Sequence, residues 1–110
     1  MTIYKILLPQ EWARFQEQGR FDGSPFDATS GFVHCSSRAQ VAGTAARFFA
    51  DEPDLVLVAL DEARLGDVRW EAASDGGVFP HVYGPLPVSA VVAVHQVAGP
   101  AAVEEALTRA

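Results

Sequence analysis

Hydrophobic and polar positions follow two different periods along the chain, and each change of period predicts a new secondary-structure element. Residues 2–8, TIYKILL, are a run of β-branched and aromatic residues that predicts a strand. Pro9 suits the first turn of a helix on which Trp12 and Phe15 share one apolar face, and Gly19 supplies a C-terminal cap. The chain therefore opens with a strand followed directly by an amphipathic helix.

The next stretch passes from turn-forming residues to a strand and a second helix. Residues 20–31, RFDGSPFDATSG, predict an irregular exposed loop, and loops of this length often border sites. Residues 32–36, FVHCS, predict a strand. The SRAQ that follows matches a Ser-x-x-Gln capping box with Ser37 as N-cap and a helix from about Arg38. One apolar stripe on this helix is formed by Val41, Ala45, Phe48 and Phe49.

The second half of the chain is richer in strands. The run 54–61, DLVLVALD, is apolar without alternation, which is typical of a central strand covered on both faces. Segment 78–84, VFPHVYG, predicts a strand in which Pro80 indicates an edge or a bulge. The other elements expected here are a single helical turn at 61–66, a strand at 68–73, a turn at 74–77, a long strand at 88–97 and a terminal helix at 99–110 with Val103 and Leu107 facing inward.

The order of these elements places helices early and strands late. This order favours an α+β fold with a split or strongly bent mixed β-sheet and flanking helices, in a single domain that spans residues 1–110. No Gly-x-Gly-x-x-Gly follows a strand, and no Gly-Lys-Ser/Thr motif is present. The usual loops that cradle nucleotide phosphates are therefore absent from the sequence.

Composition and charge narrow the class of partner. The 110 residues are 49% hydrophobic, enough for one core, and 8 Lys and Arg stand against 14 Asp and Glu, for a net charge of -6. Nucleic acid is an unfavourable partner because its binding rests on clustered basic residues. Cys35 is the only cysteine, and neither a secretory signal nor a membrane span is recognisable. We therefore expect a monomeric cytoplasmic protein with no membrane partner.

Polar residues that share a strand face are the candidate chemistry. Alternation places His34 and Ser36 on one face, directly before a helix N-terminus, where unpaired N–H groups attract acceptors or anions. The alternative interpretation is a structural histidine and a capping serine. By the same alternation His81 lies with Tyr83, and we expect these four side chains to meet in one concavity.

A carboxylate and a basic residue share a face of the strand at 68–73. Glu71 and Arg69 alternate with Trp70 there, and their alternative interpretation is a solvated surface ion pair. A zinc site is weakly supported, because no Cys-x-x-Cys or His-x-x-x-His spacing exists. Ser36 lacks the Gly-x-Ser-x-Gly elbow of a serine hydrolase, and Cys35 is expected to be buried and inert.

Several segments together carry a family resemblance. The segments IYKIL, GSPFD, GFVHCSS, VALDEARLG, RWE and FPHVYGPLP appear in the order and spacing of the small bacterial family catalogued as domain of unknown function 952. The resemblance covers residues 3 to about 97. It implies a fold similar to the ADP-ribosyltransferases, with a cleft for NAD between two halves of a split sheet, and it brings no established activity.

The wider superfamily implies roles for individual residues. FVHCSS resembles the hydrophobic-His-hydrophobic-Ser segment of the RNA 2'-phosphotransferases, which points to His34 and Ser36, with Ser37 beside them. Lys5, followed by Ile6, stands where those enzymes carry a first-strand Arg or His followed by Gly. In that resemblance Glu71 would stabilise an oxocarbenium-like transition state, and His81 or Tyr83 would stack on or hydrogen-bond the leaving ring.

The function expected on this basis is binding of NAD or a nucleotide-like molecule in a polar cleft. Catalytic roles fall to His34, Glu71 and His81, and ligand-binding roles to Lys5, Ser36, Ser37 and Tyr83. The reaction would be transfer or hydrolysis at the nicotinamide–ribose bond, with NAD as the substrate. The alternative of a different class is a non-catalytic nucleotide-binding or small-molecule-binding module, and a third is a purely structural protein.

Overall fold

A three-stranded antiparallel sheet forms the centre of the computed structural model, which describes residues 1–74 and 76–109. Its strands are β1 (Thr2–Leu7), β4 (Leu55–Asp61) and β8 (Val91–Val97), in the order β1-β4-β8. All residues of β4 except Asp61 are buried, which explains why this strand is apolar without alternation. The prediction of a central strand at 54–61 is confirmed.

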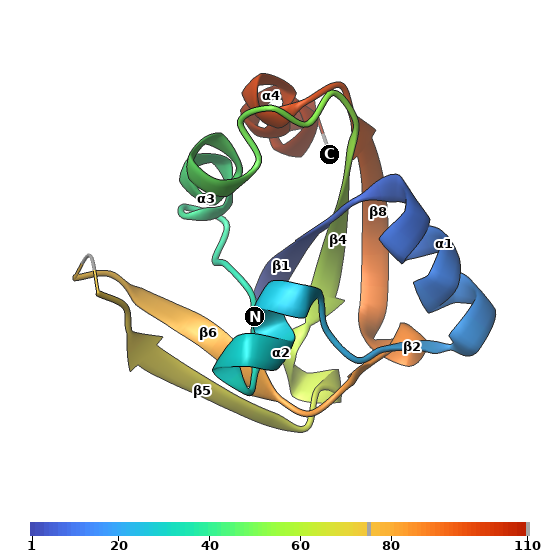
Figure 1. Cartoon of the computed structure of the whole chain (residues 1–110), viewed down its shortest axis with the longest axis vertical. Helices are drawn as coiled ribbons and strands as arrows, with labels where there is room; N and C mark the ends of the chain where they lie inside the picture. The colour runs from blue at the N-terminus through green and yellow to red at the C-terminus, as the bar shows by residue number, and fades with distance from the viewer. Residues whose placement is uncertain (75, 110) are drawn as a thin grey trace.

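A second three-stranded sheet projects away from the first (Figure 1). It contains β3 (Val33–His34), β6 (Val78–Tyr83) and β5 (Asp67–Ala72), in the order β3-β6-β5. The expectation of an edge strand at Pro80 is wrong, because β6 is the middle strand. Pro80 is tolerated there because its carbonyl accepts from Cys35 N at 3.1 Å, so its missing N–H faces the short β3 and not the ladder to β5.

The segment 20–31 is ordered, which corrects the prediction of an irregular exposed loop. It contains β2 (Arg20–Phe21), paired with β7 (Leu86–Pro87), and the short helix α2 (Pro25–Ser30). Ser24 caps this helix in a capping box, and Gly31 ends it in the left-handed region at φ 85°. The error has a physical cause: Ser, Pro, Asp and Gly favour turns, but the same residues also begin and end helices.

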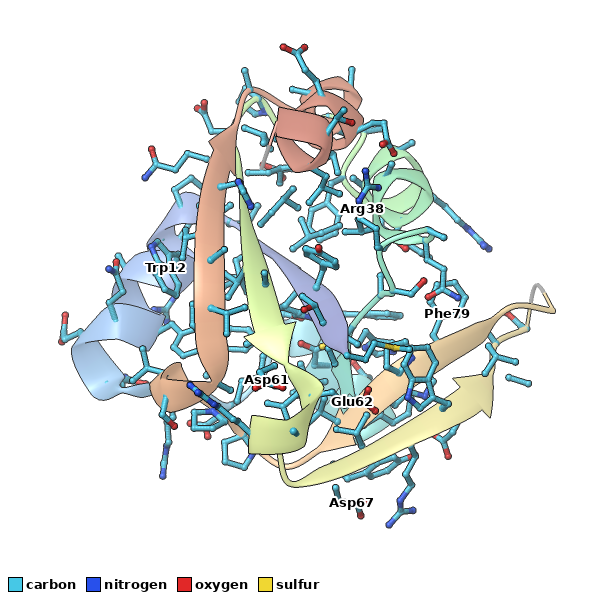
Figure 2. The ribbon with its side chains drawn as sticks, turned by 180° about the vertical axis from the view of Figure 1, so that it is seen from behind. Trp12, Arg38, Asp61, Glu62, Asp67 and Phe79 are labelled. Carbon is cyan, nitrogen blue, oxygen red and sulfur yellow. The ribbon has the colours of Figure 1, made fainter. Side chains whose placement is uncertain are left out.

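The first helix of the chain matches its prediction. Helix α1 (Pro9–Gln18) begins at the proline, and Gly19 ends it at φ 76°. The other regular segments are α3 (Val41–Phe48), α4 (Val103–Arg109) and the 3₁₀ turns η1 (Glu62–Arg64), η2 (Val88–Ala90) and η3 (Pro100–Ala102). In α4 Val103 and Leu107 are buried, as expected. Arg38, which precedes α3, forms an ion pair with Glu104 of α4, with 2.9 Å between Nη2 and Oε2 (Figure 2).

Several predicted boundaries differ from the structure. The expected capping contact is present, because Gln40 Oε1 accepts from Ser37 N–H at 2.9 Å, but residues 38–40 form a turn and helix α3 starts at Val41, not near Arg38. Phe48 is exposed, so it does not belong to the buried stripe of this helix. The strand expected at 32–36 is shorter, the one expected at 88–97 starts at Val91, and the turn expected at 74–77 includes residue 75, outside the described residues.

The core has two parts that lie on opposite faces of the central sheet. One contains Phe15 of α1, Phe21 and the inner side chains of β3 and β6, and the other contains Val41 and Ala45 of α3 with the buried residues of α4. The strands form separate sheets, as the predicted split sheet requires. All strand pairs in the described residues are antiparallel, so the expectation of a mixed sheet is wrong. The fold is therefore α+β, with several small antiparallel sheets.

Candidate functional site

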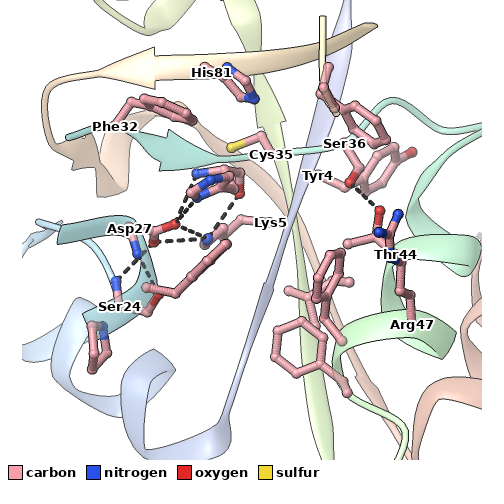
Figure 3. Close-up of a pocket in the computed structure, with 18 of the residues that line it drawn as sticks. Tyr4, Lys5, Ser24, Asp27, Phe32, Cys35, Ser36, Thr44, Arg47 and His81 are labelled. Atoms are coloured by element: carbon pink, nitrogen blue, oxygen red, sulfur yellow. Dashed lines mark hydrogen bonds and ion pairs between the residues drawn. The ribbon is translucent and has the colours of Figure 1, made fainter. Parts of the chain in front are cut away.

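A cavity of about 630 Å³ lies where the two larger sheets meet α2 and α3. Its walls come from β1, α2, β3, α3 and β6, and Figure 3 shows how their side chains face one another. Volumes of 300–1,000 Å³ are typical of small-molecule sites. Aromatic rings supply much of the wall: Tyr4, Phe26, Phe32, Phe48, Phe49 and Phe79.

The most highly connected polar group of the cavity is the carboxylate of Asp27. Lys5 Nζ donates to both of its oxygens, at 3.0 and 3.2 Å, and Ser24 N–H donates to Oδ2 at 2.9 Å. Asp27 Oδ1 accepts from the backbone N–H of His34 at 3.0 Å and lies 2.7 Å from His34 Nδ1. This carboxylate therefore ties the first strand, the short helix α2 and β3 together in one place (Figure 3).

The charges of this group are buried. The side chain of Asp27 is 2% exposed and that of Lys5 is 8% exposed. Burial acts to raise the pKa of Asp27, but the hydrogen bond from the His34 side chain, the charge of Lys5 and the N–H groups of Ser24 and His34 outweigh it. The pKa of Asp27 therefore lies well below its ordinary range, and the carboxylate is ionised.

The ring of His34 is held by the Asp27 carboxylate and by two phenylalanine rings. Phe26 stacks on it at 4.6 Å between centroids, and Phe32 lies against it at the same distance. An ionised carboxylate only accepts hydrogen bonds, so the proton between His34 and Asp27 sits on Nδ1. The other nitrogen, Nε2, has no partner among the described residues. An imidazole fixed in this tautomer presents a lone pair, which suits a general base.

A second carboxylate–imidazole contact lies beside the first. His81 is the cross-strand partner of His34 and also lines the cavity, with its Nδ1 2.8 Å from Glu71 Oε1. Tyr83 donates its hydroxyl to the same oxygen at 2.7 Å. The hydrogen bonds from Tyr83 and His81 lower the pKa of Glu71. Arg69 does not pair with Glu71 as an ion pair; it binds Asp67 and lies over the ring of Tyr83.

The far end of the cavity carries hydroxyl groups. Buried Ser36 contacts Thr44 through their hydroxyl oxygens at 3.0 Å, and Tyr4 and Arg47 lie nearby (Figure 3). Ser36 owes this position to a bridge with Tyr4, whose N–H donates to the Ser36 carbonyl at 2.8 Å. The cavity therefore has an imidazole end and a hydroxyl end, joined by aromatic walls.

The structure brings together most of the residues that the sequence singled out. Lys5, His34, Ser36 and His81 line the cavity. Glu71 and Tyr83 do not line it but form the cluster that holds His81. Ser37 does not line the cavity; it begins the turn that precedes α3.

Asp27 is the site residue that sequence reasoning missed. It was assigned to an exposed loop, although the pattern Ser24-Pro25-x-Asp27 matches the start of a capped helix. Cys35 is buried, as predicted, and burial raises the pKa of its thiol to about 12, while its lack of reactivity stays a prediction. Within the described ranges no three His, Cys, Asp or Glu side chains gather as metal ligands. No helix described in the structure has the length and apolar character to cross a membrane.

Comparison with known proteins places the chain among proteins of unassigned function. Residues 6–94 match the model of a family described as a protein of unknown function, DUF952. The chain is similar to the X-ray structure of protein CC0527 from Caulobacter crescentus, with 44% identity, 87% of this chain and 85% of that chain covered, and a TM-score of 0.83. The solution NMR structure of CC0527 gives 40% identity, 94% and 95% coverage, and a TM-score of 0.82. No curated protein matches the chain.

Proposed function

The chain belongs to the DUF952 family, whose description names no activity, so the functional argument rests on the cavity. We propose that this cavity binds NAD or a similar nucleotide-like molecule. The reaction proposed is transfer or hydrolysis at the nicotinamide–ribose bond. The ADP-ribosyltransferase-like fold that the sequence resemblance implies supports this reaction, and in this proposal the NAD cleft lies between the β1-β4-β8 and β3-β6-β5 sheets. The observation that carries the catalytic part is the Asp27–His34 contact of 2.7 Å inside the cavity.

In the proposed hydrolysis His34 is the general base. The bond between ribose C1' and the nicotinamide nitrogen breaks, and its electron pair neutralises the pyridinium ring. A water molecule attacks C1', and Nε2 of His34 takes the proton that this water loses. Asp27 holds the imidazole in the correct tautomer and stabilises the imidazolium that forms, as the carboxylate does in other acid–base triads.

The other expected site residues take supporting roles in this proposal. His81, oriented by Glu71 and Tyr83, faces the leaving ring, and the negative charge of Glu71 offsets the developing oxocarbenium charge through the imidazole. Lys5 keeps Asp27 ionised and positioned. The hydroxyl of Ser36 holds a ribose or phosphate oxygen in this proposal, whereas Ser37, outside the lining with its N–H bound to Gln40, takes no direct part.

The test measures release of nicotinamide from NAD by the purified protein. Positioned general bases contribute roughly 10²–10⁴-fold to a rate, so His34→Gln should lower turnover at least about 100-fold. His95→Gln is the matched control, because His95 lies on β8 and does not line the cavity. Equal nicotinamide release by the wild type and His34→Gln would refute the assigned role of His34.

A specific observation favours the alternative, a binding module without catalysis. Asp27 is bound to Lys5 and His34, and Glu71 is bound to His81 and Tyr83, so neither carboxylate is left to contact a ribose cation directly. Calorimetric titration with NAD separates the two functions: binding without nicotinamide release supports the module. Absence of both binding and turnover contradicts both functions.

Thermal melts with NAD test the ligand role of His34 in either case. A ligand at about 100 times its dissociation constant stabilises the folded protein by about 2.7 kcal/mol. In His34→Ala this ligand-dependent increase should disappear. A large loss of stability without any ligand effect in either protein would identify His34 as a purely structural residue.

We also propose that the protein works as a cytoplasmic monomer and that nucleic acid is not its partner. The single buried Cys35, which has no disulfide partner, supports a reducing compartment. The net charge of -6 argues against binding of long polyanions. Size-exclusion chromatography with light scattering tests the oligomeric state.

A further inference from the structure

Two histidines from distant parts of the sequence stand side by side in the cavity. His34 on β3 and His81 on β6 are direct partners in an antiparallel strand pair, so both side chains lie on the same face of the sheet. Their ring centroids are 5.5 Å apart, with the rings nearly perpendicular at 70°. Phe32 packs on both rings, at 4.6 Å from His34 and 4.0 Å from His81, and limits their rotation.

Each histidine has its own carboxylate on the same ring nitrogen. Nδ1 of His34 lies 2.7 Å from Asp27, and Nδ1 of His81 lies 2.8 Å from Glu71. Both carboxyls have a pKa below the ordinary value, so each accepts a proton held on Nδ1. The two Nε2 atoms, which have no partner among the described residues, remain to exchange protons with a ligand.

Paired imidazoles of this kind suit a reaction in which one proton is removed while another is delivered nearby. Cleavage of nicotinamide from NAD needs only the first of these, because nicotinamide leaves as a neutral molecule without protonation. Hydrolysis of a phosphate ester needs both, since the attacking water loses a proton and the leaving alkoxide gains one. The proposed NAD reaction places His81 beside the leaving ring but gives it no proton to deliver, so it leaves the acid–base capacity of the second imidazole unused.

We propose that His34 and His81 form a two-histidine acid–base pair that hydrolyses a small cyclic phosphodiester, of the class of nucleoside 2',3'-cyclic phosphates. One neutral imidazole takes a proton from water, whose oxygen forms a bond to phosphorus. One ring P–O bond breaks, and the other imidazole, in its protonated form, gives its proton to the ribose oxygen that leaves. The product is a nucleoside monophosphate, and no metal, oxidant or further reactant is required.

The cavity limits the substrate to a small molecule with a low charge. Its volume of about 630 Å³ holds a mononucleotide, and the cationic Lys5 and Arg47 in its lining stand against the anionic Asp27 and Glu11. A near-balance of charge suits the single negative charge of a cyclic phosphodiester, whereas a long RNA strand would meet a protein of net charge -6.

The entrance of the cavity suits a planar base. Phe26 of α2 and Phe48 of α3 are 60% and 59% exposed, yet their rings lie 6.3 Å apart and nearly parallel, at 30°. Both rings line the cavity, and Phe26 stacks on His34. A nucleobase stacked on these rings would cover apolar surface that is otherwise in water and would place its ribose phosphate toward the histidines.

The experiment incubates the purified protein with adenosine 2',3'-cyclic monophosphate and follows the product by ³¹P NMR. We expect conversion to one regioisomer of the monophosphate, because the two histidines hold the substrate in one orientation. His34→Gln and His81→Gln should each lower the rate at least about 100-fold, and His95→Gln should leave it unchanged. No turnover by the folded wild type, or an equal rate in all variants, would overturn the proposal.

A pH profile of the wild-type rate keeps the proposal testable where His81→Gln fails to fold. One acid and one base predict a bell-shaped profile, of which His34→Gln should lose one limb. The charged groups that face these rings are Asp27 and Lys5 beside His34, and Glu71 and Arg69 beside His81. A flat profile would overturn the proposal. NAD assayed in parallel shows separately whether the reaction proposed above occurs.

Discussion

Replacement of Asp27 by asparagine tests the buried charge cluster most directly. The isosteric Asp27→Asn removes the negative charge from a group that binds Lys5 at 3.0 Å and His34 at 2.7 Å. The Lys5 ammonium, only 8% exposed, would remain as a buried charge without its counter-ion. Breaking a buried pair in this way costs about 3–5 kcal/mol, a large share of the 5–15 kcal/mol that typically stabilises a domain.

Thermal and urea unfolding measure this loss. For a chain of 110 residues about 1 kcal/mol shifts the Tm by about 4 °C, so Asp27→Asn should lower the Tm by roughly 12–20 °C. The double variant Lys5→Met with Asp27→Asn removes both charges and should recover part of the loss, because no unpaired charge stays buried. A loss below about 1 kcal/mol in Asp27→Asn, or strictly additive effects of the two substitutions, would refute the reasoning.

Three further predictions follow from burial, pKa and backbone geometry. The free energy of unfolding should fall as the pH drops below about 4, because a carboxyl with a lowered folded pKa stabilises fully above its unfolded pKa and loses that contribution progressively as the pH falls toward its folded pKa. In Asp27→Asn this fall should be shallower, and parallel acid titrations of the two proteins would contradict the assignment. Cys35, with a pKa raised to about 12, should react with a thiol reagent at pH 8 only as fast as the protein opens, and labelling within seconds would show that it is accessible. Gly99→Ala should lower the free energy of unfolding in urea by about 1–2 kcal/mol, because Gly99 has φ 96° and a Cβ there would lie 3.3 Å from the Glu52 carbonyl oxygen. The control Gly66→Ala, with open space around the added Cβ, should change stability little, and equal stabilities of the two variants would contradict this prediction.

The candidate site illustrates which features could be predicted from the sequence. Alternation along the strands indicated that His34 and His81 belong to polar faces, and both line the cavity. The role of Asp27 was hidden because a capping box and an exposed turn use the same residue types. Its function as an acceptor for Lys5 depends on two segments that are 22 residues apart, which no local pattern reports.

Glu71 shows the same limit in another form. The alternation along β5 showed which face Glu71 occupies, and the sequence predicted that it acts on the ligand directly. Its actual partner, however, depends on the register between β5 and β6. In that register the carboxylate meets His81 and Tyr83. A shift by one residue would turn the side chain to the other face, and only the paired strand selects between the two.

Local periodicity and helix-end residues determined some of the elements, although they missed β2 and α2. The apolar run of β4 specified a central strand, and Pro9 with Gly19 specified the two ends of α1, because these signals act within a few residues. The tertiary structure decided which strands became neighbours, and so brought Lys5, Asp27 and His34 into one buried cluster and placed His81 beside it. The hydrogen bonds and the nearby positive charge that keep this carboxylate ionised despite its burial exist only after those distant segments have packed, and the same packing orients the histidine.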